Sequence, residues 1–128
     1  MSERPEDINR EEVTLTQKNV RALAGRLKTL LTGKKLHIET SLTSPEHGLF
    51  GDIVYKNHEL REIDYLRHGK FADLFVEIKG LPSPIVVVSG ENVIFEDVLN
   101  GGERIVTFTH TVPFSNTIYT HKIFYPKD

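Results

Sequence analysis

The stretch EIDYLRHGKFADLFVEIKG, residues 62 to 80, decides how the rest of the chain is interpreted. Apolar and polar residues alternate on both sides of a turn that contains Gly69, which is typical of two strands joined as a hairpin. The apolar residues of the second strand are Ala72, Leu74, Val76 and Ile78. Side chains of a strand point alternately to its two faces, so we expect one face to be buried and the other to be polar.

The register of this hairpin is constrained because both apolar sets must face the same core. Ile63 and Tyr65 form the apolar set of the first strand. Directly opposed residues share a face, so Asp64 should lie near Phe75 or Glu77. The residues expected on the polar face are Glu62, Asp64, Glu77 and Lys79. Two or three carboxylates and a lysine should therefore converge on the exposed side.

Length and composition are those of one ordinary globular domain. The chain has 128 residues, of which 38% are apolar and 27% are charged. It has no cysteine, which excludes disulfides, thiolate metal sites and cysteine nucleophiles. No apolar run approaches the roughly 20 residues of a membrane-spanning helix, and the first residues are charged where a secretory signal would be apolar. We therefore expect a soluble, cytoplasmic or otherwise intracellular protein with no membrane partner.

The formal net charge of −2 hides an uneven distribution of charge. Residues 1 to 12 are acidic and have almost nothing to bury, so we expect a flexible arm ahead of a single domain of residues 13 to 128. The next segment is basic, and Lys18, Arg21 and Lys28 should share one face of a helix. This face is either a solvated surface or a binding surface for phosphates or for an acidic partner such as the arm.

The segment that follows Thr14 has the periodicity of an amphipathic helix. Its apolar stripe consists of Val20, Leu23, Ala24, Leu27, Leu30 and Leu31. Thr14 and Gln17 resemble a capping box at the start of the helix. Gly33 is placed to end the helix in a left-handed conformation.

Beyond the helix and outside the central hairpin, the spacing of apolar residues predicts further strands. The segments are residues 36–40, 49–56, 85–88, 93–99, 104–112 and 117–125. Only 93–99 is ambiguous between a strand and a short helix, and we favour a strand because β-branched residues and turn signals surround it. The predicted fold class is α+β, with one N-terminal amphipathic helix packed on an antiparallel β meander that forms a barrel or a sandwich.

Residues 62 to 79 resemble the metal-binding core of the PD-(D/E)xK nucleases. Asp64 matches the first acidic position of that core, and Glu77 and Lys79 match its ExK half. The resemblance implies that Asp64 and Glu77 hold Mg²⁺ and that Lys79 positions or activates the attacking water. Carboxylate oxygens suit Mg²⁺, and a bound metal stabilises charge that develops on phosphate.

The same resemblance implies a nucleic-acid substrate, which the basic helix face would hold through its phosphate backbone. The chain departs from the family pattern after the ExK strand, where the nuclease core has a helix. Residues 81 to 84 here read LPSP, and more strands follow. A polar outer face that keeps a half-buried strand soluble is the other interpretation of these charges.

Among the histidines, His110 and His121 are the most suggestive of a metal site. A hairpin between the last two strands can place them opposite each other. If Val112 pairs with Thr117, however, His110 faces Tyr119 instead. No third ligand is evident in the sequence.

The sequence contains no serine-hydrolase, P-loop, dinucleotide-binding, zinc-peptidase or EF-hand pattern. We therefore expect a non-catalytic assembly or binding module without a cofactor, which contacts other protein subunits in a homo- or hetero-oligomer. The alternative is a Mg²⁺-dependent nuclease that uses Asp64, Glu77 and Lys79. A small-ligand barrel is a third possibility, although no residue of the sequence identifies a ligand.

Overall fold

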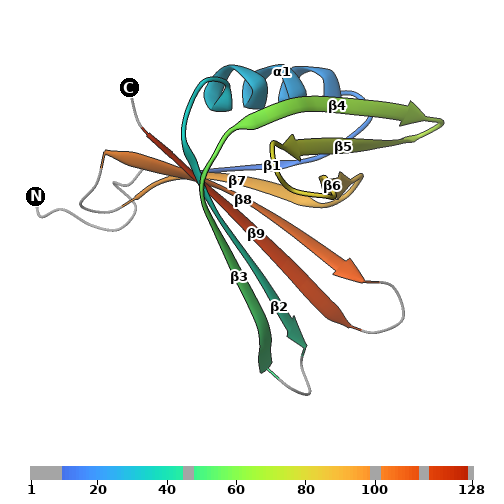
Figure 1. The fold of residues 1–128 in the computed structure, drawn as a ribbon. Coiled ribbons are helices and arrows are strands. Elements are labelled where there is room, and N and C mark those ends of the chain that lie inside the picture. Colours follow the sequence, from blue (N-terminus) through green and yellow to red (C-terminus); the bar gives the residue numbers. More distant parts are fainter. Residues whose placement is uncertain (1–9, 45–47, 99–101, 113–115, 127–128) are drawn as a thin grey trace, which may run out of the picture.

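The computed structural model describes residues 10–44, 48–98, 102–112 and 116–126. Within these ranges, nine strands form two antiparallel sheets, and there is one helix (Figure 1). In chain order the elements are β1 (Arg10–Thr14), α1 (Val20–Leu31), β2 (Leu36–Ser44), β3 (Gly48–His58), β4 (Leu60–His68), β5 (Phe71–Ile78), β6 (Ile85–Val88), β7 (Asn92–Asp97), β8 (Glu103–Val112) and β9 (Thr117–Pro126).

The two sheets differ in size and in topology. The large sheet has the strand order β1-β7-β8-β9-β2-β3, and the small sheet has the order β4-β5-β6. The predicted α+β class is confirmed, and the described strands form two open sheets and not a closed barrel. The ambiguous segment 93–99 contains a strand, β7, as we favoured. No helix in the described part of the chain is long and apolar enough to cross a membrane.

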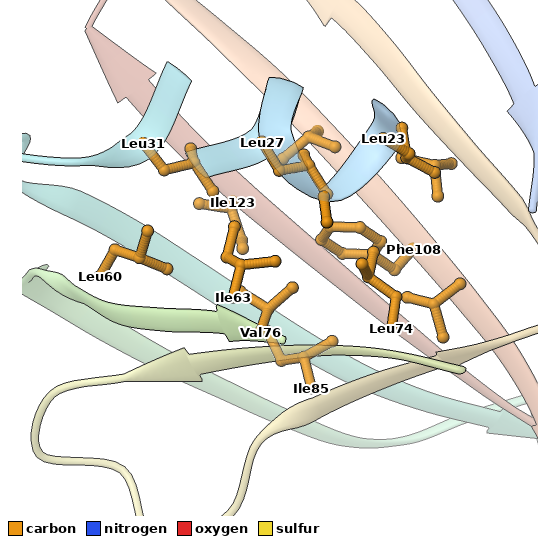
Figure 2. Close-up of a cluster of buried hydrophobic side chains, with 14 of the residues drawn as sticks. Leu23, Leu27, Leu31, Leu60, Ile63, Leu74, Val76, Ile85, Phe108 and Ile123 are labelled. Atoms are coloured by element: carbon orange, nitrogen blue, oxygen red, sulfur yellow. The ribbon is translucent and has the colours of Figure 1, made fainter. Parts of the chain in front are cut away.

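The hydrophobic core lies between α1 and the inner faces of the two sheets. Figure 2 shows the side chains of Leu23, Leu27 and Leu31 pointing from the helix toward Ile63, Leu74 and Val76 of the small sheet and toward Phe108 and Ile123 of the large sheet. Each of these residues is at most 6% exposed. Full burial of such a side chain contributes roughly 1.5–3 kcal/mol, so the apolar stripe of the helix joins the two sheets into one domain.

The helix begins later than predicted, at Val20. Thr14 belongs to β1, so the predicted capping box of Thr14 and Gln17 is wrong. Instead, the backbone N–H of Thr16 donates to Asn19 Oδ1 at 2.8 Å, and the backbone N–H of Asn19 donates to Thr16 Oγ1 at 3.2 Å. These reciprocal bonds satisfy the backbone of the turn between β1 and α1, and they leave Thr14 free to pair within the sheet.

The C-terminal end of the helix follows the prediction. Gly33 adopts a φ of +78°, in the left-handed region that side chains with a Cβ rarely occupy. The backbone N–H of Thr32 donates to the carbonyl oxygen of Lys28 at 3.1 Å, which satisfies one of the free carbonyls of the last turn. The chain then reverses into β2, whose first residue is Leu36.

The strand β1 corrects the expected boundary of the acidic arm. Residues 10 to 12 pair antiparallel with β7, with Glu11 opposite Phe95. Strand β1 forms one edge of the large sheet, where a charged sequence such as REEVT discourages pairing with another chain. The remaining residues of the expected arm, 1 to 9, lie outside the described residues.

The central hairpin has one of the two expected registers, with Asp64 opposite Phe75. Buried and partly exposed residues alternate along β5, and its predicted inner set, Ala72, Leu74, Val76 and Ile78, is buried. Ile63 is buried, as expected. Tyr65 faces the same side but is 38% exposed, because it lies nearer the turn, where β4 extends beyond α1 (Figure 1).

Candidate functional site

The small sheet has a face that points away from the core, which we call the outer face. It is formed by Glu62, Asp64, Leu66 and His68 of β4, by Phe71, Asp73, Phe75 and Glu77 of β5, and by Val86 and Val88 of β6. Every second residue of β5 and β6 is buried, and β4 pairs with β5 in register, so strand alternation brings these side chains onto one surface.

Apolar side chains occupy much of the outer face. Leu66 and Phe71 are 55% and 57% exposed, and they project from neighbouring strands on the two sides of the turn at Gly69. Phe75 pairs directly with Val86 of β6, so the apolar surface continues across the sheet. Phe71 is exposed because it alternates with the buried residues of β5. Soluble monomers rarely expose a contiguous apolar surface of this kind unless it contacts a partner.

Two carboxylates of the outer face are paired within the chain. Asp73 Oδ2 lies 3.2 Å from His68 Nε2. Glu62 Oε1 lies 3.2 Å from Lys28 Nζ and also accepts a hydrogen bond from the backbone N–H of Ile63. The bond from Ile63, followed by the ammonium group of Lys28, lowers the pKa of Glu62. The charge of Glu62 is therefore largely balanced by Lys28, whereas Asp73 has a hydrogen-bond partner in His68.

The other two carboxylates of this face, Asp64 and Glu77, have no ion pair or hydrogen bond with any described residue. They occupy diagonal positions, because Asp64 is opposite Phe75 and Glu77 is opposite Glu62. The outer face therefore combines an apolar surface with two carboxylates, Asp64 and Glu77, that have no partner among the described residues.

Lys79, the third residue of the nuclease resemblance, follows the last residue of β5 and is engaged elsewhere. Its Nζ lies 3.2 Å from Glu59 Oε1, and its backbone N–H donates to the carbonyl oxygen of Glu59 at 2.9 Å. Hydrogen bonds from Lys35 and then Lys79 lower the pKa of Glu59. In the described ranges, no group of three or more His, Cys, Asp or Glu residues could hold a metal ion. The nuclease assignment of Asp64, Glu77 and Lys79 stays a prediction.

The predicted basic face of the helix includes one residue that lies outside the helix. Lys18 precedes Val20, and its side chain is exposed. Arg21 lies in the first turn and is exposed, whereas Lys28 lies in the last turn and pairs with Glu62. The two cations at the start of the helix are thus separate from Lys28, which is already bound to the small sheet.

Arg26 is a helix cation that the sequence analysis did not single out. Its Nη2 lies 2.6 Å from Glu11 Oε1, and its guanidinium carbon lies 3.9 Å from the centroid of the Phe95 ring. The hydrogen bond between the two side chains raises the pKa of Arg26 and lowers the pKa of Glu11. Because only the pairing of β1 with β7 brings Glu11 to the helix, no local sequence signal could have identified this contact.

The last two strands pair in the register that separates the two candidate histidines. Val112 is opposite Thr117, so His110 is opposite Tyr119. His110 Nδ1 lies 3.0 Å from Glu91 Oε2. The predicted alternative in which the histidines face each other directly is therefore not the one that forms.

His121 lies two residues beyond Tyr119, and the two rings are parallel with their centroids 6.0 Å apart. The Nδ1 atom of His121 lies 3.0 Å from Thr40 Oγ1 on the neighbouring strand. Burial, with a smaller contribution from the charge of His110, lowers the pKa of His121 to about 4. His121 is therefore neutral at neutral pH.

Comparison of the chain with protein-family models, with curated proteins and with solved structures gives no match. Its function must therefore be inferred from its own residues. The outer face of the small sheet is the candidate functional surface, because it combines exposed apolar side chains with unpaired charge.

Proposed function

We propose that this protein is a non-catalytic interaction module that binds a protein partner through the outer face of the small sheet. The observation that carries the proposal is the exposure of Leu66 and Phe71, both more than half accessible to water. The alternation of side chains along the strands, together with the strand register, places Phe75 and Val86 on the same face. Removing apolar surface from water contributes roughly 25 cal/mol per Å², so covering these side chains favours association.

The charges on the outer face indicate the chemistry of the partner. Asp64 and Glu77 are unpaired, so a partner that presents lysine or arginine beside its own apolar residues would balance them. A second copy that presented the same face would bring carboxylates against carboxylates, which costs free energy. The partner is therefore a different protein surface, apolar at its centre and basic at its rim.

Two synthetic peptides test this assignment. They share one alternating pattern of apolar residues, and their polar positions are lysine in one and glutamate in the other. We expect the lysine peptide to shift the backbone amide resonances of residues 64–66, 71–75 and 86–88 in the ¹⁵N-labelled protein. The glutamate peptide should bind at least about tenfold more weakly than the lysine peptide. Added salt should weaken the binding of the lysine peptide.

Matched variants locate the contact. The double substitution Leu66→Ser and Phe71→Ser should abolish binding of the lysine peptide. Val54→Ser is the control, because Val54 is also 46% exposed but lies on the large sheet. Circular dichroism should show that both variants fold. Equal binding of the two peptides, or binding that survives the double substitution, would contradict the proposal. Sedimentation that shows a concentration-dependent dimer, which the double substitution disrupts, would also contradict it.

A further inference from the structure

A pocket of about 180 Å³ opens between the large sheet and the segment that links β5 to β6. Ile38, Ile53 and His121 line it from β2, β3 and β9. Leu81 and Ile85 line it from the linking segment and from the start of β6. Ile85 points to the opposite side of the small sheet from Val86 of the outer face, so this pocket is separate from the proposed partner surface.

The walls of the pocket are apolar except for a few hydrogen-bonding groups. Thr40 and His121 form one polar pair, with Oγ1 and Nδ1 3.0 Å apart, and Tyr55 and Ser83 add hydroxyl groups. No Asp, Glu, Lys or Arg is among the described lining residues. A charged ligand would lose part of its hydration here without meeting an opposite charge, which is unfavourable.

The state of the histidine supports the same selectivity. His121 is mostly buried, and its pKa is lowered to about 4 by that burial and by the charge of His110. A neutral imidazole can donate or accept a hydrogen bond, but it cannot balance an anion. The pocket therefore provides shape, apolar contact and neutral hydrogen bonding.

We propose that this pocket binds one small uncharged aromatic molecule whose hydroxyl or ring N–H group hydrogen bonds with His121 or Thr40. The volume is sufficient for a single ring with few substituents, since a dry apolar cavity of about 150 Å³ in another protein holds benzene. Ile38, Ile53 and Ile85 supply flat apolar contact to the ring. The polar pair fixes the orientation of the ligand.

Three probes of similar size and different charge test the selectivity: p-cresol, benzoate and benzylammonium. We expect p-cresol to shift the amide resonances of Thr40, Ile53, Ile85 and His121 in a saturable manner at pH 7. Benzoate and benzylammonium should bind at least about tenfold more weakly, because neither charge finds a partner in the pocket. The absence of saturable p-cresol binding, similar affinity for all three probes, or shifts centred on another part of the chain would overturn the proposal.

Two neighbouring residues of β3 provide a matched pair of variants. Ile53 lines the pocket and is 53% exposed, whereas Val54 is 46% exposed and points to the opposite face of the large sheet. Ile53→Asp should weaken p-cresol binding by about tenfold or more, and Val54→Asp should leave it unchanged. Equal effects of the two substitutions would contradict the proposed location.

His121→Phe tests the hydrogen bond separately, since it keeps an aromatic ring in place. This substitution should weaken the binding of p-cresol by roughly tenfold more than the binding of toluene, because toluene has no hydroxyl group that could lose a hydrogen-bond partner. A parallel loss for both ligands would contradict the role of His121. The double substitution of Leu66 and Phe71 on the outer face should not affect p-cresol, so this proposal and the proposed function can fail independently.

Discussion

Acidification from pH 7 to pH 4.5 should destabilise this protein more than it destabilises the His121→Gln variant. In the folded chain the pKa of His121 is lowered to about 4, whereas the ordinary value of 6.5 applies once the ring is exposed. Between these values the unfolded chain binds a proton that the folded chain does not bind. The stability that burial of the neutral ring allows is therefore fully present above pH 6.5 and is lost as the pH falls toward 4.

The magnitude follows from the difference between the two pKa values of His121. Each unit of difference corresponds to about 1.4 kcal/mol, and the part of the difference that lies between pH 7 and pH 4.5 is worth about 2 kcal/mol. Glu91 and His110 are ionisable neighbours on the same side of the large sheet, with Oε2 and Nδ1 3.0 Å apart. The expected quantity is therefore the difference between wild type and variant, in which the contributions of these neighbours largely cancel.

Urea unfolding followed by circular dichroism at pH 7, 6, 5 and 4.5 measures this difference. The free energy of unfolding of the wild type should fall by about 2 kcal/mol more than that of the variant over this range. An NMR titration of the His121 ring gives its pKa independently. Parallel loss of stability in the two proteins, or a ring that titrates above pH 6, would refute the argument from burial.

Three other predictions concern the helix, the nuclease residues and the N-terminal segment. Gly33→Ala should lower the free energy of unfolding by about 1 kcal/mol, because residue 33 has a φ of +78°. Gly25→Ala should raise the free energy of unfolding by roughly 0.5–1 kcal/mol, because a Cβ at this helix position meets nothing within 4 Å. Urea unfolding measures both changes. We expect no cleavage of DNA or RNA by the wild type with Mg²⁺ or Mn²⁺, since Lys79 is paired with Glu59. Cleavage that Lys79→Ala abolishes would establish the nuclease prediction instead. Deleting residues 1–9 should leave the midpoint of thermal unfolding nearly unchanged. Deleting residues 1–12 should lower that midpoint, because three paired residues of β1 and the ion pair between Glu11 and Arg26 are lost. Identical midpoints for the two deletions would contradict this expectation.

The elements that the sequence predicted well are those with a strong local period. The stripe from Val20 to Leu31 identified the helix, and the alternation from Ala72 to Ile78 identified the buried face of β5. The same alternation placed Phe71 at the surface and Asp64 and Glu77 on the outer face. A period is a property of consecutive residues, because each backbone geometry repeats its side-chain directions over two or 3.6 residues. The sequence alone therefore determined the class of fold and placed Asp64 and Glu77 on one surface. It was wrong in predicting that surface to be polar, because Leu66, Phe71 and Phe75 share it.

Only the tertiary structure decided which elements lie side by side. Pairing of β1 with β7 turned Thr14 from a helix cap into a strand residue and brought Glu11 to Arg26. Pairing of β9 with β2 buried His121 beside Thr40 and formed one wall of the pocket. Many strand pairings satisfy the same local pattern, and the choice among them depends on the free energy of the whole core. Contacts between residues distant in the chain, together with the pKa values and pockets that they create, follow from that choice.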